Sequence, residues 1–339
     1  MITWYSFDPT DSLFFKGSTP MQAGVDHTAD SIFPPRPSTL EGALRTLVLR
    51  QQGINPADYY KGMVDKDILD AIGRADEPAP FCVIGPLFRL FGRLLIPAPY
   101  TWYTEEMPNN DRQTQSGITK IIRSTSLKSM KTGKLNIKSS AGDHLQWVRG
   151  ENSGLASMGG MWVTTDLLGK DAADTVLVFQ GHQDMDHKKP LAVSGVSLYV
   201  DEPHVGLALQ EHVRTAKRHH LYAFTHYRLR AGVSLVFGVN RELPLKPGGI
   251  LQLGGEMRFG AYARLDTANI PQGASVLYMS LGMVKTEPEL TQALIATGKP
   301  IYAGGWDMRK GFHKDMAGYY PPGSVFTEEV KTRPNFIQI

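Results

Sequence analysis

The stretch from Leu13 to Leu49 constrains the fold more than any other part of this chain. Ser38 stands at a possible N-cap and Glu41 follows three residues later, which is the spacing of a capping box. In such a box, each side chain accepts a hydrogen bond from a free backbone N–H of the first turn. The apolar residues from Leu40 to Val48 recur at helical spacing and form one face. We therefore expect a helix that begins at Ser38, ends at Gly53 and anchors a core.

Strand-like patterns on both sides of this helix predict a β-α-β beginning. Ile2 to Phe7 contains the aromatic residues that strands favour. Phe81 to Phe91 has the composition of one or two strands, interrupted at Gly85-Pro86. Further along, Val233 to Val239 alternates as one buried strand face.

The second half of the chain repeats the β-α-β pattern and adds a hairpin. Thr286 and Glu289 have the spacing of a second capping box. Val205 to Leu209 and Leu221 to Tyr227 are typical of two hairpin strands, which leaves Gln210 to His220 as a long basic tip. Further strands are expected at Thr175 to Gln180, Val196 to Val200, Ile250 to Arg264, Val276 to Leu281 and Ile301-Tyr302.

Two halves that each carry strand-helix-strand units favour an α+β fold over a doubly wound sheet. We expect two ferredoxin-like (RRM-like) domains. The first covers residues 1–165, and the second covers residues 166–339 with the projecting hairpin at about 205–227.

A long basic insertion is expected within the first of these domains, at about residues 103–152. Apolar periodicity fades there, and the composition shifts to Ser, Thr, Asn, Gly and Lys. No acidic residue occurs from Arg112 to Gly142, although that stretch contains seven basic residues. The pattern predicts a long loop or a partly ordered insertion that is locally strongly basic.

Several functional classes are excluded by missing motifs. The chain has no G-x-S-x-G nucleophile elbow, no G-x-x-x-x-G-K-[ST] phosphate loop and no G-x-G-x-x-G between a strand and a helix. Its one cysteine, Cys82, lies in an apolar run and is expected in the core. A single cysteine cannot form an internal disulfide, and no run approaches a membrane span, so we expect a cytoplasmic protein.

Two groups of histidines are candidates for metal or acid–base chemistry. The segment from His182 to His187 holds two imidazoles and two carboxylates in six residues. Adjacent residues on one loop rarely converge on one ion without distant ligands, so we favour a solvated loop and expect no metal and no cofactor. The second group consists of the hairpin histidines His204, His212, His219 and His220. Imidazole as a class can act as a general base near neutral pH, but we favour an exposed basic hairpin here.

Glycines next to positive charge occur near the C-terminal end. Gly304 and Gly305 precede Trp306, and three cations follow, namely Arg309, Lys310 and Lys314. Glycine lets backbone N–H groups approach a phosphate closely, and cations neutralise it. This mixture of small, basic and planar residues is what single-stranded RNA binding requires, although a turn that leads to a last strand from Ser324 is the plain alternative.

Several motifs together resemble one known family. The opening Phe7-Asp8-Pro9, the run Leu13-Phe14-Phe15-Lys16-Gly17 and the block from Phe33 to Arg45 are similar to the third Cmr subunit of type III-B CRISPR effector complexes. Weaker glycine motifs follow in the order of that family: Val205-Gly206-Leu207-Ala208-Leu209, Leu253-Gly254-Gly255-Glu256, and Gly304 through Ser324. The family belongs to the RAMP superfamily, whose members have ferredoxin-like domains and bind CRISPR RNA.

The resemblance implies a non-catalytic subunit that holds the 5′ repeat-derived tag of the CRISPR RNA in antiviral defence. It also implies as partners the large polymerase-like subunit, an adjacent backbone RAMP subunit and other subunits of the complex. The hairpin would correspond to the projecting thumb with which these subunits kink the guide. The long basic insertion departs from the family pattern, and its role stays open.

We expect Lys16, Arg36, Arg45 and Lys310 to line a tag-binding surface, with Arg214, Lys217 and Arg218 acting at the hairpin tip. The complete set of expected RNA-binding residues is Lys16, Arg36, Ser38, Arg45, Arg214, Lys217, Arg218, Gly304, Gly305, Arg309, Lys310 and Lys314. Two alternatives stay open. One is a metal- or histidine-dependent RNase that processes CRISPR RNA, and the other is a scaffold whose basic segments meet acidic subunits.

Overall fold

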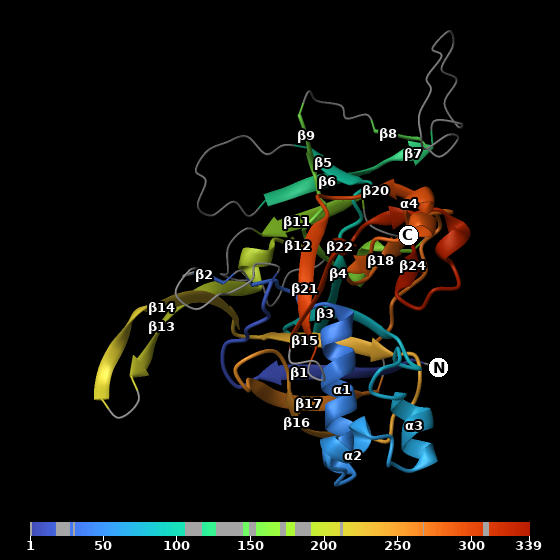
Figure 1. Ribbon diagram of the computed structural model, residues 1–339. Coiled ribbons are helices and arrows are strands. Elements are labelled where there is room, and N and C mark those ends of the chain that lie inside the picture. The colour runs from blue at the N-terminus through green and yellow to red at the C-terminus, as the bar shows by residue number, and fades with distance from the viewer. Residues whose placement is uncertain are drawn as a thin grey trace.

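The computed structural model describes residues 2–17, 28–29, 31–105, 117–126, 145–148, 154–169, 174–179, 191–210, 213–266, 268–307 and 312–339. The protein is a mixed α+β structure that is rich in strands and has few helices in this described part (Figure 1).

One large sheet of twelve strands runs through the described part of the molecule. Its strands are antiparallel except for the parallel pair β11 and β12. The order is β16 (Gly248–Gln252), β17 (Phe259–Leu265), β1 (Thr3–Pro9), β15 (Val233–Val239), β3 (Val83–Leu90), β4 (Arg93–Pro97), β10 (Trp162–Thr164), β12 (Leu191–Val193), β11 (Thr175–Phe179), β6 (Gly117–Arg123), β5 (Trp102–Glu105) and β9 (Leu155–Ser157).

The centre of this sheet is a split β-α-β unit. Strands β1 and β3 are joined through helix α1 (Pro37–Gln51), and β15 lies between them, antiparallel to both. The expected buried face of β15 is present, since Val233, Leu235, Phe237 and Val239 are all buried, although Val236 on the other face is buried as well. Helix α1 crosses the front of these strands in Figure 1 and buries its apolar face against them. Strands β15 and β17 complete this unit from beyond residue 165.

The start of α1 differs from the expected capping box. The N-cap is Arg36, the first helical residue is Pro37, and no side chain caps the helix. Proline suits the first helical position because its fixed φ is already helical and it has no N–H to leave unsatisfied. Ser38 is therefore the second helical residue, and Glu41 accepts a hydrogen bond from the backbone of Val83 instead. The predicted end of the helix near Gly53 is confirmed.

Three shorter helices complete the described helical content: α2 (Pro56–Tyr60), α3 (Lys66–Ile72) and α4 (Pro288–Ala293). The second capping box is also wrong, because Glu287 is the N-cap of α4 and has no side-chain cap. The hydroxyl of Thr286 instead donates to the carbonyl oxygen of Gly318 at 3.1 Å. In both helices, a proline in the first turn moved the start away from the predicted Ser or Thr.

Smaller sheets surround the large one. One contains β20 (Leu294–Ala296), β23 (Val325–Phe326), β18 (Tyr278–Ser280) and β24 (Phe336–Gln338). Another contains β19 (Val284–Lys285), β22 (Phe312–Tyr320) and β21 (Ile301–Asp307). A third pairs β7 (Thr125–Ser126) with β8 (Gln146–Trp147), and three 3₁₀ turns occur at Thr165–Leu167, Gly195–Ser197 and Glu328–Val330.

Two expectations about the first half are corrected. The basic stretch around residues 103–152 supplies strand β6 and most of β5 to the large sheet, although apolar periodicity did not indicate a strand there. Cys82 is exposed, and not part of the core, because β3 begins only at Val83.

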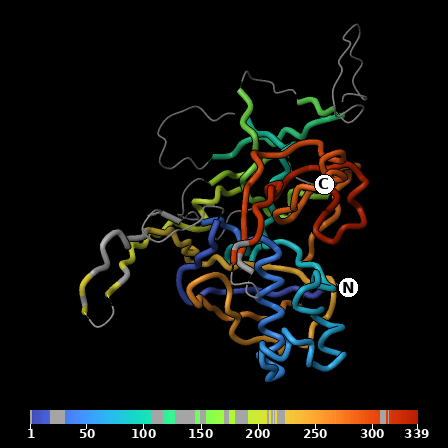
Figure 2. Tube along the Cα trace, viewed as in Figure 1, coloured from blue at the N-terminus to red at the C-terminus, as the bar shows by residue number. Residues whose placement is uncertain are grey.

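The hairpin is longer than expected. Strand β13 (Tyr199–Gln210) pairs with β14 (Val213–Leu229), and β14 also pairs in parallel with β2 (Thr28–Ala29). The segment that we expected as a long tip is therefore mostly strand, and the predicted strand at residues 196–200 is partly a 3₁₀ turn. Figures 1 and 2 show this hairpin projecting from one side of the body.

The contact between the C-terminal part and strand β3 gives a first prediction. A Cβ atom on Gly282 would lie 2.0 Å from the carbonyl oxygen of Gly85, which is backbone and cannot rotate away. Gly282→Ala is expected to lower the free energy of unfolding by about 1–3 kcal/mol, the usual cost of overpacking. Urea denaturation measures this change in the free energy of unfolding, and Gly42→Ala is the control.

Gly42 lies inside α1 with no atom within 4 Å of the new Cβ. Gly42→Ala should therefore stabilise the protein by about 0.5–1 kcal/mol. Equal stability of the two variants would contradict this account of the packing at Gly282.

Candidate nucleic-acid interface

The N-terminus of α1 lies against the β21–β22 hairpin through Arg36. Its Nη1 atom donates to the Tyr319 hydroxyl at 3.3 Å, and its guanidinium carbon lies 5.4 Å from the centre of the Tyr319 ring. This contact holds a cation at the positive end of the helix dipole. The first turn of α1 contains no acidic residue that would offset that charge.

Gly305 and Lys314 bring a second cation to the same place. Gly305 in β21 pairs with Lys314 in β22, beside an irregularity in register at Ala303 and Gly305. A Cβ atom on Gly305 would lie 3.5 Å from Lys314 Cδ and 3.7 Å from Arg36 Nη2. The absent side chain therefore leaves the two cations close together. Gly304 and Gly305 belong to strand β21.

The other predicted residues near α1 are placed differently. Ser38 is exposed at the second helical position, next to Arg36. Lys16 forms an isolated antiparallel bridge with Ser31, on the segment that leads to Arg36. Arg45 lies nine residues further along the helix, or about 13 Å. Its Nη1 and Nη2 atoms donate to the carbonyl oxygens of Arg74 and Glu77 at 3.2 and 2.9 Å, so the structure does not bring Arg45 to the others.

Three of the remaining predicted residues lie on the β13–β14 hairpin. Arg214, Lys217 and Arg218 belong to the outer part of strand β14. Arg309 and Lys310 lie outside the described residues, as do His182, His187 and His212. The surface that the described residues assemble is thus Arg36, Ser38, Gly304, Gly305, Lys314 and Tyr319, which we call the α1–β22 surface.

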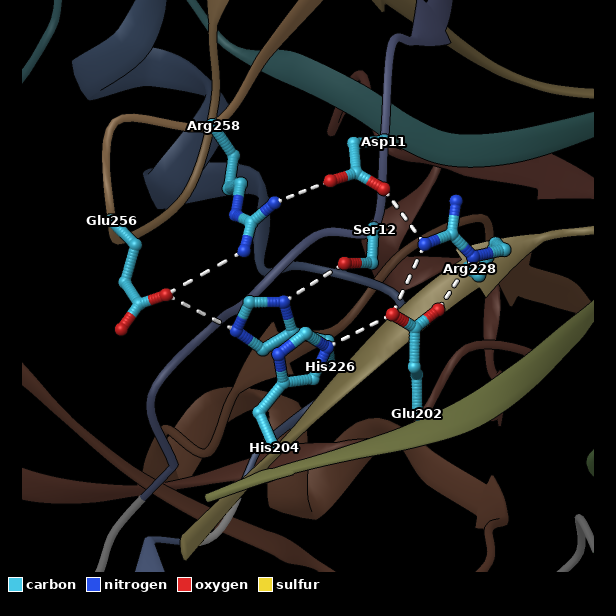
Figure 3. Close-up of polar contacts among 8 residues, drawn as sticks. All are labelled: Asp11, Ser12, Glu202, His204, His226, Arg228, Glu256 and Arg258. Carbon is cyan, nitrogen blue, oxygen red and sulfur yellow. Dashed lines mark hydrogen bonds and ion pairs between the residues drawn. The ribbon is translucent and has the colours of Figure 1, made fainter. Parts of the chain in front are cut away.

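A separate polar cluster lies at the root of the β13–β14 hairpin (Figure 3). His226 is fully buried, its Nδ1 atom lies 2.9 Å from the Ser12 hydroxyl, and its Nε2 atom faces a Glu256 carboxylate oxygen at 3.3 Å without hydrogen-bond geometry. His204 stacks on His226 with ring centres 4.1 Å apart, and its Nε2 atom lies 2.9 Å from Glu202. Burial, His204 and Arg258 together lower the pKa of His226 below its ordinary value.

Two arginines join the carboxylates of this cluster. Arg228 pairs with Glu202 and with Asp11, the latter at 2.7 Å, and these contacts raise the pKa of the guanidinium. Hydrogen bonds from Arg228 also lower the pKa of Glu202. Arg258 pairs with Asp11 at 2.7 Å and with Glu256 at 3.7 Å. The network therefore connects three segments: the turn after β1, the hairpin and the turn between β16 and β17 (Figure 3).

General acid–base cleavage requires imidazoles that reach the substrate, and His226 has no exposed surface with which to do so. Of the histidines considered for the RNase alternative, His182, His187 and His212 lie outside the described residues. Among the described residues, no group of three or more metal-ligating side chains is arranged to hold an ion. The cluster joins the root of the hairpin to the turn after β1 and to the turn between β16 and β17.

Sequence reasoning missed Tyr319, Ser12 and His226. Tyr319 lies in the stretch from Gly304 to Ser324, for which we expect RNA binding, but the alternation of residues along a strand does not distinguish it from its neighbours. The pairing of Ser12 with His226 joins residues 214 positions apart. No local pattern in the sequence could predict a contact between such distant residues.

Comparison with solved structures gives two matches that cover nearly the whole chain. One is a chain of the cryo-EM structure of the type III-B Cmr-β complex bound to cognate target RNA and AMPPnP, with a TM-score of 0.51, 14% identity, and coverage of 97% of this chain and 87% of that chain. The other is from the same complex bound to cognate target RNA, with a TM-score of 0.51, 16% identity and the same coverage. At this identity, the likeness shows a shared fold.

A weaker match, with a TM-score of 0.42 and 12% identity, is a chain of the Csm3–Csm4 subcomplex of the type III-A CRISPR-Cas interference complex. It covers 96% of this chain and 92% of that chain. None of the curated proteins matches the sequence. Within the described residues, no helix has the length and apolar character needed to span a bilayer.

The family comparison confirms the resemblance seen in the motifs. A family model described as "CRISPR-associated protein (Cas_Cmr3)" matches residues 5–281, which include most of β1, helix α1, the hairpin and the turn between β16 and β17. The chain therefore belongs to the Cas_Cmr3 family of CRISPR-associated proteins.

Proposed function

We propose that this protein is a non-catalytic RNA-binding subunit of a type III CRISPR effector complex and holds the 5′ repeat-derived tag of the CRISPR RNA. The α1–β22 surface carries this proposal, because it gathers Arg36 and Lys314 at a helix N-terminus around a glycine that admits close approach. Membership of the Cas_Cmr3 family and a fold shared with a chain of an RNA-bound Cmr-β complex support it.

The proposal includes the surroundings of the subunit. We place it in the cytoplasm, between the large polymerase-like subunit and the adjacent backbone RAMP subunit. Its two ferredoxin-like domains, at residues 1–165 and 166–339, stay a prediction. The split β-α-β unit of β1, α1, β3 and β15 supports a ferredoxin-like arrangement around α1.

The α1–β22 surface is tested by removing its two cations. Arg36→Ala/Lys314→Ala is expected to weaken binding to a CRISPR RNA that carries its 5′ tag, and to flatten the salt dependence of binding. Each phosphate contact on a single strand contributes about 0.7 to the slope of log K against log salt, so the slope should fall by about 1.4. Fluorescence anisotropy over a series of salt concentrations measures both quantities.

The matched control removes the same charge elsewhere. Lys61 and Lys66 are exposed at α2 and α3, toward the opposite end of α1 (Figure 1), so Lys61→Ala/Lys66→Ala should leave affinity and slope near the wild-type values. A folded Arg36→Ala/Lys314→Ala protein that behaved like this control would refute the RNA-binding role of the surface.

A further inference from the structure

We propose that His204, flanked by Phe224, is a stacking platform for one unpaired nucleobase of bound single-stranded RNA. This inference rests on the proposed function, because it requires that RNA reach the root of the β13–β14 hairpin. It adds a base-binding position to the phosphate contacts of the α1–β22 surface.

Ring geometry at the hairpin root is the first step. His204 in β13 lies directly opposite Phe224 in β14, and their ring planes differ by 17°. His204 also stacks on His226 with an interplanar angle of 22° (Figure 3 shows the two histidines). The Phe14 ring stacks on His226 with an interplanar angle of 23°. Phe14, His226 and His204 thus form a row of nearly parallel rings. His204 is at one end of that row, and its side chain is 33% exposed.

The surrounding charges fix the orientation of this ring. Nε2 of His204 forms a hydrogen bond with the Glu202 carboxylate. Arg228 forms ion pairs with Glu202 and with Asp11. Since these acidic and basic groups are paired with one another, the platform carries little net charge. A ring that is already oriented loses little conformational freedom when a base stacks on it.

A nucleobase is the ligand that this surface fits best. Single-stranded RNA is recognised by stacking of bases on aromatic and histidine side chains, next to cations that follow the backbone. Phe224 belongs to strand β14, and the sequence of the same strand contains Arg214, Lys217 and Arg218. In this role His204 provides a surface on which the base stacks, and it transfers no proton.

Two probes separate stacking from phosphate binding. The first is a uridine 12-mer, whose bases stack weakly on one another, and the second is an abasic ribose-phosphate 12-mer with the same charge. His204→Leu in the full chain should lower affinity for the uridine strand about 5- to 150-fold, the usual range for one base–aromatic contact. Affinity for the abasic strand should be unchanged. His204→Phe keeps a planar ring and should bind the uridine strand like wild type.

Each outcome bears on the platform or on the proposed function. Equal losses on both strands would mean that His204 acts through structure or charge, and no loss on either would mean that no base stacks there; both results overturn the platform. Rescue by His204→Phe with an unchanged salt slope supports it. The proposed function fails separately, if wild-type protein binds neither 12-mer nor tagged CRISPR RNA. Thermal unfolding of each variant shows that it is folded.

Discussion

Phe88→Ala is expected to lower the free energy of unfolding by about 3–5 kcal/mol. Phe88 lies in the middle of β3 and its side chain is fully buried. Its ring meets Trp162 edge to face at 4.6 Å and stacks near Tyr199 at 6.1 Å. Removing the ring leaves a cavity between the split β-α-β unit and the strands beyond it. Urea denaturation followed by circular dichroism gives the difference.

A smaller truncation at the same position is the control. Phe88→Leu keeps more of the apolar contact and leaves a smaller cavity, so it should cost less than Phe88→Ala. If alanine and leucine cost the same, the loss would come from somewhere other than the cavity.

Phe88 also connects the core to the functional parts of the molecule. Phe33, three residues before Arg36, packs on Phe88, on Tyr199 and on Tyr227, with ring centres 6.0, 4.7 and 5.0 Å apart. Tyr199 and Tyr227 belong to the two strands of the hairpin. One aromatic cluster therefore supports both the segment that presents Arg36 and the root of the hairpin.

Parts of the fold with strong local patterns could be predicted from the sequence. The apolar faces of β15 and α1 are both buried against a core, and such burial requires apolar residues at regular intervals in the sequence. The outer parts of β13 and β14 carry no trace of such burial, because they project from the body, where Leu207, Leu209 and Val213 are exposed. The two strands pair as far as Gln210 and Val213 through backbone hydrogen bonds. Such bonds depend little on side-chain identity and therefore leave almost no pattern in the sequence.

The candidate site divides in the same way. Arg36, Gly305 and Lys314 could be selected because cations and glycines gather in the sequence near each of them. That Arg36 meets Tyr319 across 283 positions is a result of tertiary structure. Arg45 illustrates the converse: its charge and position near Arg36 suggested a phosphate contact, but the loop after α3 supplies two carbonyl oxygens that bind it.

His226→Ala is expected to lower the free energy of unfolding by about 2–4 kcal/mol at pH 7.5. The change leaves a cavity under His204 and deprives the buried Ser12 hydroxyl of its partner. A buried polar group without a partner costs about 1–3 kcal/mol, and the lost packing adds to that. Urea denaturation measures the loss, and Ser12→Ala, which removes only the hydroxyl, should cost less.

The cost of His226→Ala should shrink as the pH falls. Because the pKa of His226 is lowered in the folded protein, the unfolded chain binds more protons between that pKa and the ordinary value near 6.5. Stability supplied by the neutral ring is complete above pH 6.5, declines as the pH falls through this window, and stays constant below the lowered pKa. Comparing wild type with His226→Ala at pH 7.5 and 5.5 measures this contribution. A difference in unfolding free energy that did not change with pH would mean that His226 binds its proton equally well in the folded and unfolded chain, and the hairpin root would then not depend on a neutral imidazole.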